Sequence, residues 1–123
     1  MGRLVAVIDD DESVRRSFGR LLRAADFQPV GYASAEAYLD DPAHAAVDCL
    51  VLDVQLGGMS GLELNDRIVS AGRTTPVIFV TAHDESELRA RAFATGCAGY
   101  FLKSDPGAAV LDAIREATNE LAP

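Results

Sequence analysis

Five polar side chains that suit phosphoryl chemistry end four short apolar runs of this sequence. They are Asp9, Asp10, Asp53, Thr81 and Lys103. Carboxylates that are brought together repel one another, and a hard divalent cation relieves that repulsion. Mg²⁺ favours a site with a few carboxylates, several waters and phosphate oxygens. These residue types therefore predict one site for a metal ion and a phosphoryl group, provided that the fold gathers the four runs.

The chemistry of each side chain suggests a separate task. Asp53 can act as a nucleophile, because a carboxylate oxygen that attacks phosphorus forms an acyl phosphate. Lys103 and the metal ion would offset charge on the transferring phosphoryl group, and the Thr81 hydroxyl can donate a hydrogen bond to it. We expect Asp9 and Asp10 to have a charged partner, since adjacent acids that end an apolar strand are costly without compensation.

Five short apolar runs alternate with segments of helical spacing. The runs are nearly continuous and rich in β-branched residues, which is typical of strands buried on both faces. Between them, apolar residues recur at the spacing of a helix. Strand and helix in strict alternation predict an α/β fold with a five-stranded parallel sheet and helices on both faces. The predicted strands are 4–9, 29–32, 49–53, 76–81 and 99–103.

Capping residues predict where three of the helices begin. Capping-box spacing occurs twice, and an aspartate followed by proline predicts a third helix start. The helix after this proline has apolar residues at helical spacing up to Leu121. The capping residues are Ser60 with Glu63, Asp84 with Glu87, and Asp105 before Pro106.

Length and composition are those of one ordinary globular domain, spanning residues 1–123. The chain is 49% hydrophobic and 24% charged. Its formal net charge of −8 argues against direct nucleic-acid binding, which needs clustered Lys and Arg. No stretch is long and apolar enough to span a membrane, and the N-terminal apolar run stops at acids rather than at a cleavage site. We therefore expect a cytoplasmic protein with no membrane partner.

Four segments together resemble the signature segments of the receiver domain of two-component response regulators. They are "VIDDDESVRRS", "LVLDVQLGGMSGLEL", "VIFVTAH" and "GYFLKSD", in this order, and the resemblance covers essentially the entire chain. It implies a flavodoxin-like (βα)5 fold with strand order 2-1-3-4-5. It also implies a phosphorylation-controlled signalling switch that accepts a phosphoryl group from a phosphohistidine on a sensor histidine kinase or a phosphotransfer protein.

The resemblance also implies a role for each matching residue. Asp53 matches the phosphorylated aspartate. Asp9 and Asp10 match the acid pair that holds Mg²⁺, with Asp10 favoured as the direct ligand. The other matches are the Gln55 backbone carbonyl as a metal ligand, Lys103 as the phosphate-contacting lysine, Thr81 as the switch hydroxyl, Tyr100 as the aromatic that follows it, and Gln55 and His83 as residues that tune the acyl-phosphate lifetime.

The stretch "YASAEAYLD" resembles receivers that precede helix-turn-helix DNA-binding output domains. The resemblance thus implies transcription regulation through an output domain or a protein target, and it allows a homodimer that forms on phosphorylation. The segment "DESELRARAFATG" offers few large apolar residues, and weakly packed elements open most easily. We expect residues 84–116, with Tyr100 among them, to form the face that changes and meets partners.

Two positions depart from the pattern of the family. The loop after the phosphorylated strand usually contains a proline, whereas this chain has Gly57 and Gly58, which should make the loop more mobile. The lysine is usually followed by proline, often through a cis bond, whereas Ser104 follows Lys103 here. A cis bond before a non-proline residue costs roughly 2.5 to 4 kcal/mol. The bond is therefore either cis and strained, or trans with Lys103 reaching the site along a different path.

Two alternative functions remain open at this stage. One is a receiver-like protein-binding module that is not phosphorylated, which the two departures allow. The other is an enzyme of the haloacid-dehalogenase type, which also uses a nucleophilic aspartate. The usual DxD pattern of that enzyme class would need an acid at position 55, which is Gln55. We therefore expect no turnover of external substrates.

Overall fold

A computed structural model describes residues 2–118 of the chain. Leu121, which the sequence predicts at the end of the last helix, lies outside these residues. The described residues contain five strands and five α-helices in alternation, as well as one short 3₁₀ helix, η1 (Pro42–Ala46). None of the described helices is both long enough and apolar enough to cross a membrane.

The five strands form one parallel sheet in the order β2-β1-β3-β4-β5, as predicted. Pairing is in register along the centre of the sheet, with Val51 opposite both Val7 and Ile78. The chain crosses from β1 outward to β2 and then returns to β3 on the other side of β1. The order of the strands therefore reverses between β1 and β3, where open α/β sheets bind ligands. The strands are β1 (Leu4–Ile8), β2 (Gln28–Tyr32), β3 (Cys49–Asp53), β4 (Val77–Thr81) and β5 (Gly99–Leu102).

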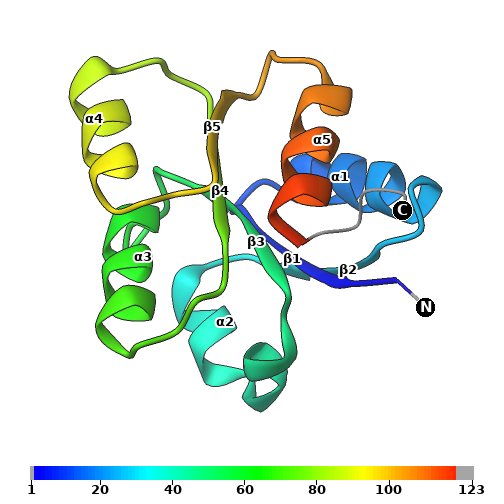
Figure 1. The fold of residues 1–123 in the computed structure, drawn as a ribbon, viewed down its shortest axis with the longest axis horizontal. Helices are drawn as coiled ribbons and strands as arrows, with labels where there is room; N and C mark the ends of the chain where they lie inside the picture. The colour runs from blue at the N-terminus through cyan, green and yellow to red at the C-terminus, as the bar shows by residue number, and fades with distance from the viewer. Residues whose placement is uncertain (1, 119–123) are drawn as a thin grey trace.

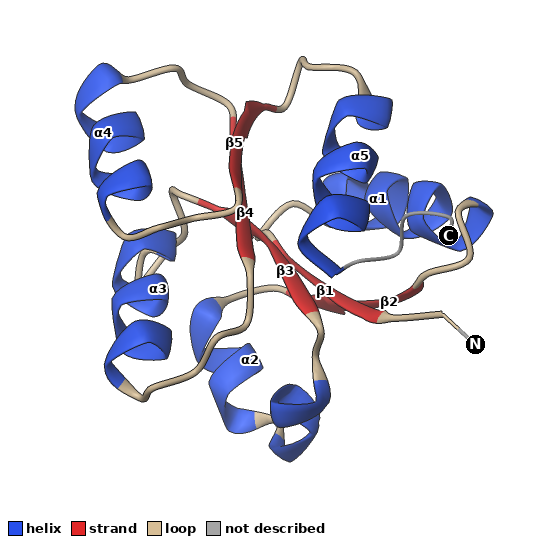
Figure 2. Cartoon of the chain, in the orientation of Figure 1, coloured by secondary structure: helices blue, strands red, loops and turns tan. Residues whose placement is uncertain are grey.

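Helices cover both faces of the sheet (Figures 1 and 2). Helices α1 and α5 lie on one face, and α2, α3 and α4 lie on the other. Successive residues of each strand alternate between the two layers: Val5 and Val7 contact the α1/α5 layer, whereas Ala6 and Ile8 contact the other layer. The helices are α1 (Glu12–Ala24), α2 (Ala35–Asp40), α3 (Gly61–Ser70), α4 (Ser86–Ala94) and α5 (Gly107–Thr118).

Burial differs between the central and the edge strands. Every residue of β3 and β4 is buried, as are four of the five residues of β1. The edge strands β2 and β5 each have one buried residue, Tyr32 and Tyr100. The prediction that all five strands are buried on both faces is therefore wrong for the edges, because an edge strand has a covering neighbour on one side only.

The predicted helix starts have different outcomes. Ser60 and Glu63 form the expected capping box at the start of α3, which confirms that prediction. Asp84 does not cap α4: the N-cap is Glu85, and its side chain makes no capping bond. The α5 helix begins at Gly107, two residues after Asp105, and the Asp105 carboxylate instead accepts a 2.8 Å hydrogen bond from the Leu102 N–H. Spacing alone cannot choose between a helix cap and a tight turn after a strand.

Tyr32 ties the end of β2 to the turn after α2. Its hydroxyl donates a 2.7 Å hydrogen bond to the Asp41 carboxylate. This bond lowers the pKa of Asp41, while burial and then the Asp41 bond raise the pKa of Tyr32 to about 12. The lowered pKa of Asp41 contributes stability at pH values above the ordinary carboxyl pKa. The raised pKa of Tyr32 contributes stability at pH values below the ordinary phenol pKa.

We expect Tyr32→Phe to lower the urea midpoint at pH 7. The difference from wild type should shrink as the pH falls through the carboxyl range, because the hydrogen bond from Tyr32 to protonated Asp41 is weaker than the bond to the carboxylate. It should also shrink above about pH 10, where the folded state holds a proton that the unfolded chain releases. Urea unfolding of both proteins across this pH range is the measurement. A difference that stays constant with pH would contradict the assignment.

Core truncation tests the two-layer packing. Phe79 is fully buried in the centre of the sheet, whereas Val69 on α3 is 53% exposed. Phe79→Ala should lower the free energy of unfolding by about 3–5 kcal/mol, because it leaves a cavity. Val69→Ala should change it by no more than about 0.5 kcal/mol. Urea denaturation of the two variants provides the comparison, and similar losses in both would contradict the described core.

Candidate active site

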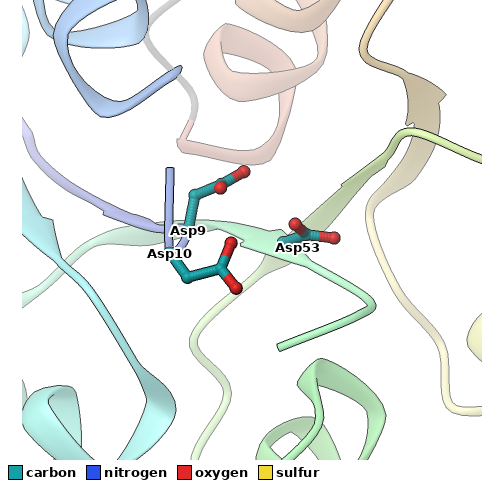
Figure 3. A group of neighbouring side chains, drawn as sticks. All are labelled: Asp9, Asp10 and Asp53. Carbon is teal, nitrogen blue, oxygen red and sulfur yellow. The ribbon is translucent and has the colours of Figure 1, made fainter. Parts of the chain in front are cut away.

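The predicted polar side chains meet at the carboxyl edge of the sheet. Asp9 directly follows β1, Asp53 ends β3, Thr81 ends β4 and Lys103 directly follows β5. Because all the strands are parallel, these four positions lie at the same edge. Figure 3 shows Asp9 and Asp10 beside Asp53 at the point where the strand order reverses.

The three aspartates form a group that could hold a metal ion. Asp9, Asp10 and Asp53 each offer a carboxylate oxygen, and these oxygens lie within 4.8 Å of one another. Asp9 is 3% exposed and Asp53 is 6% exposed, whereas Asp10 is exposed to solvent. The group thus combines two buried carboxylates, of Asp9 and Asp53, with the exposed carboxylate of Asp10. This all-oxygen donor set is the type that Mg²⁺ binds.

The Lys103 ammonium lies between the two buried carboxylates. Its Nζ is 2.9 Å from Asp9 Oδ2 and 3.0 Å from Asp53 Oδ2. The lysine side chain is 24% exposed, so water reaches its outer side. Burial lowers the pKa of Lys103, but the hydrogen bonds to Asp9 and Asp53 and the charges of these two carboxylates together outweigh burial and raise the pKa. Lys103 is therefore charged at neutral pH and compensates part of the carboxylate charge.

Each buried carboxylate is also oriented by a backbone N–H two residues further along the chain. Asp9 Oδ1 accepts from the Asp11 N–H at 2.9 Å, and Asp53 Oδ1 accepts from the Gln55 N–H at 3.0 Å. In both aspartates Oδ2 is the oxygen that faces Lys103. In each aspartate, one carboxylate oxygen thus bonds to the local backbone and the other contacts Lys103.

Burial raises the pKa of the Asp53 carboxyl, and the neighbouring Asp9 charge adds to this effect. The Lys103 and Gln55 hydrogen bonds lower the pKa but do not cancel the increase. The ionised form of Asp53 therefore carries a free-energy cost in the fold. Perturbed carboxyl groups of this kind are typical of functional sites.

The Thr81 hydroxyl is fully buried and lies beside the loop after β4 rather than on Asp53. Its Oγ1 is 3.3 Å from the backbone N–H of His83 and 3.3 Å from the His83 carbonyl. His83 itself is exposed. The position of Thr81 at the sheet edge follows from the sequence, but the orientation of its hydroxyl depends on this loop. Its switch role and the tuning roles of His83 and Gln55 remain predictions.

Tyr100 lies on the edge strand β5 and is buried under α4. Its ring centroid is 6.3 Å from that of Phe79 and 6.3 Å from that of Phe93, and the Arg89 guanidinium lies 5.3 Å from the ring centroid. Within residues 2–118 the Tyr100 hydroxyl has no hydrogen-bond partner. Ala92 is the buried residue of α4, and Phe93 is 49% exposed. The weak packing predicted for this helix is therefore present.

The peptide bond between Lys103 and Ser104 is trans, since no peptide bond of the described residues is cis. Lys103 still reaches Asp9 and Asp53, so the trans bond does not keep it from the site. The turn is closed by the hydrogen bond from Leu102 N–H to Asp105. Sequence reasoning missed Asp105 in this role.

Arg15 is a second contact that sequence reasoning missed. Its guanidinium donates a 2.7 Å hydrogen bond to the Asp9 carbonyl. An arginine in the first turns of a helix looks like an ordinary surface residue, so the sequence held no signal for this contact.

The family model that describes the response regulator receiver domain matches residues 5–115. The chain belongs to this family. Its receiver fold therefore explains why the acid pair, Asp53, Thr81 and Lys103 lie at one edge of the sheet.

Curated relatives of this receiver domain are response regulators. Response regulator protein TmoT of Ectopseudomonas mendocina is 32% identical over 120 residues, which are 98% of this chain and 54% of that protein. Transcriptional regulatory protein FixJ of Azorhizobium caulinodans is 36% identical over 111 residues, 90% of this chain and 53% of that protein. The chain thus spans about half the length of these relatives.

Solved structures show the same fold. The response regulator StyR superposes with a TM-score of 0.88 at 33% identity, over 98% of this chain and 61% of that chain. The FixJ-N crystal structure superposes with a TM-score of 0.85 at 27% identity, over 100% of this chain and 98% of that chain. The flavodoxin-like order of the strands agrees with these neighbours.

We expect metal-free Asp53→Asn to be more stable than wild type at neutral pH. The raised pKa means that the fold disfavours the charged form of Asp53, and asparagine is a neutral replacement of similar size. The Tm should rise by a few degrees in the presence of a chelator, as measured by thermal unfolding. The Tm difference should vanish at acid pH, where Asp53 is also neutral. A lower Tm at pH 7 would contradict the assigned cost of the charge.

Proposed function

We propose that this receiver domain is a phosphorylation-controlled switch of a two-component system. It would accept a phosphoryl group on Asp53 from a phosphohistidine of a sensor histidine kinase or a phosphotransfer protein. The observation that carries the proposal is the bridge from Lys103 to Asp9 and Asp53 beside the exposed Asp10 carboxylate. This arrangement concentrates one cation and three carboxylates at an edge that an external phosphoryl donor can reach.

Asp9, Asp10, Asp53 and the Gln55 backbone carbonyl would hold Mg²⁺, with Asp10 as a direct ligand. Carboxylate oxygens within 4.8 Å of one another fit an oxygen-seeking divalent ion. When bound, Mg²⁺ supplies positive charge that neutralises the phosphoryl oxygens. Because Asp10 is exposed, a hydrated ion can approach the site without opening the fold.

Asp53 would act as the nucleophile of the transfer. One of its carboxylate oxygens forms a bond to phosphorus while the bond from phosphorus to the histidine nitrogen breaks, and that nitrogen keeps the bonding electron pair. The Lys103 ammonium would then leave Asp53 Oδ2 and contact a phosphoryl oxygen, which carries negative charge. Its remaining bond to Asp9 Oδ2, 2.9 Å long, would keep the ammonium in place.

Thr81 and Tyr100 would convert this local event into a change of surface. The Thr81 hydroxyl makes two long contacts of 3.3 Å to the His83 backbone, so it could turn toward a phosphoryl oxygen. The loop after β4 and the weakly packed α4 would follow, together with the Tyr100 ring that lies beneath Phe93 and Arg89. Residues 84–116 would then present a new face to partners.

The output would be protein or DNA recognition by another part of the assembly. Relatives named as transcriptional regulators are about twice as long as this chain, which supports a DNA-binding output domain or a separate protein target. A homodimer formed on phosphorylation is one way to deliver that output. We propose that the chain works in the cytoplasm, does not bind nucleic acid directly, and turns over no external substrate.

The deciding experiment is intact-mass spectrometry after incubation with acetyl phosphate and Mg²⁺. Wild type should gain a single phosphoryl group, because Asp53 and the cation-binding carboxylates lie together. Asp53→Asn and a metal-free sample should gain none. A known receiver domain run in parallel shows that the phosphodonor is active.

Absence of the adduct, together with absence of Mg²⁺ binding, would overturn the proposal and favour a binding module that is not phosphorylated. Turnover of p-nitrophenyl phosphate that is lost in Asp53→Asn would instead indicate an enzyme that acts on external esters. The proposal predicts an adduct without such turnover.

A further inference from the structure

The loop between β3 and α3 must be ordered for the site to work, yet its sequence is flexible. It carries Gln55, whose carbonyl would bind the metal, and it continues through two adjacent glycines, Gly57 and Gly58. Glycine has the widest backbone freedom of any residue, so two in succession make ordering costly. Some contact outside the loop would have to restrict it.

The two ends of the loop are fixed by local contacts. At its start, Asp53 Oδ1 accepts from the Gln55 N–H. At its end, the capping box of Ser60 and Glu63 begins α3, and the Gly61 N–H donates to the Val54 carbonyl at 3.0 Å. These contacts close the loop but do not hold the glycines between them.

Glu36 supplies a contact to the middle of the loop. It lies in the first turn of α2, and its Oε2 accepts a 2.9 Å hydrogen bond from the Met59 N–H, 23 residues further along the chain. That hydrogen bond is the first cause of the lowered pKa of Glu36, with a smaller contribution from the charge of Arg67. The carboxylate is therefore ionised at neutral pH, when hydrogen bonds to it are strongest.

Gly58 fits this contact both in conformation and in space. Its φ is +74°, a backbone conformation that residues other than glycine rarely adopt. A Cβ built at this position would lie 2.6 Å from Glu36 Oε2. A Cβ at Gly57 would meet nothing within 4 Å. The two glycines thus differ: Gly58 allows the carboxylate of Glu36 to approach the backbone, and Gly57 has no such constraint.

Glu36 itself is well placed to act as an anchor. The α2 helix begins with the Ser34 side chain accepting from the Ala37 N–H at 3.0 Å, and Ala35 is fully buried. The first turn of α2 is thereby fixed against the core, while the Glu36 side chain remains at the surface. A fixed helix turn can hold the loop without being part of the metal site.

We propose that Glu36 is a positioning residue for the Asp53 site. Its carboxylate holds the turn at Gly58 and Met59, so that the Gln55 carbonyl is already in place when Mg²⁺ binds. This role rests on the proposed function, because it concerns the binding of that metal. Loss of the contact leaves the carboxylates intact but makes metal binding bear the cost of ordering the loop.

Two measurements on the same variants test the proposal. Hydrogen exchange of the Met59 amide in metal-free protein reports the contact itself. Calorimetric titration with MgCl₂ reports the affinity. In Glu36→Ala, the Met59 amide should exchange faster and the Kd for Mg²⁺ should rise roughly 3- to 10-fold, because a few loop residues become free. Glu36→Gln keeps an acceptor oxygen, so its exchange rate and its Kd should lie between those of wild type and those of Glu36→Ala.

Matched controls separate positioning from general effects. Asp40→Ala removes the same charge from an exposed site on the same helix and should leave both readouts unchanged. Gly57→Ala should also preserve the contact, whereas Gly58→Ala should weaken Mg²⁺ binding as Glu36→Ala does. Because Glu36 is exposed, its variants should remain folded, and far-UV circular dichroism checks this.

The outcomes distinguish this inference from the proposed function. Failure of wild type to bind Mg²⁺ would overturn the proposed function. Wild-type binding with an unchanged Kd in Glu36→Ala, or an equal rise in Kd in Asp40→Ala, would overturn only the role of Glu36. Unchanged exchange of the Met59 amide in Glu36→Ala would also overturn that role.

Discussion

The Lys103 ammonium between Asp9 and Asp53 is the interaction on which the site depends. Two carboxylates with 3% and 6% exposure would repel each other strongly in a medium of low polarity. The shared cation lowers that cost, and each of the two carboxylates also accepts a hydrogen bond from the backbone N–H two residues further along the chain. Compensation is incomplete, because the pKa of Asp53 is still raised. The ionised form of Asp53 therefore keeps a free-energy cost in this fold.

The buried centre of the sheet holds these groups at fixed separations. β1, β3 and β4 are covered on both faces, and their in-register pairing sets where each strand ends. Close packing of such a core resists small displacements, so Asp9, Asp53 and Thr81 extend from a rigid base. Lys103 follows the less buried edge strand β5 and reaches across by its long side chain.

Rigidity decreases toward the periphery of the site. The Thr81 hydroxyl contacts the backbone of His83 in the loop after β4. The α4 helix, which covers Tyr100, contributes one buried residue, Ala92. The loop after β3 contains two glycines, yet Glu36 contacts its middle through Met59. The domain thus combines charged groups at the ends of buried strands with neighbouring segments that have fewer buried side chains. This combination would suit the proposed switch, because a local change in charge can shift weakly packed elements.

The sequence by itself determined the strand and helix alternation, the parallel sheet and the edge where Asp9, Asp53, Thr81 and Lys103 meet. Apolar runs and their terminal residues are local features, and parallel strands bring their ends together. Only the tertiary structure decided the partners of Glu36, Arg15 and Asp105, the failure of Asp84 to cap α4, the trans bond after Lys103 and the exposure of the edge strands. Those features depend on residues that are distant in sequence or on competition between alternative hydrogen bonds. Local pattern carries no information about either.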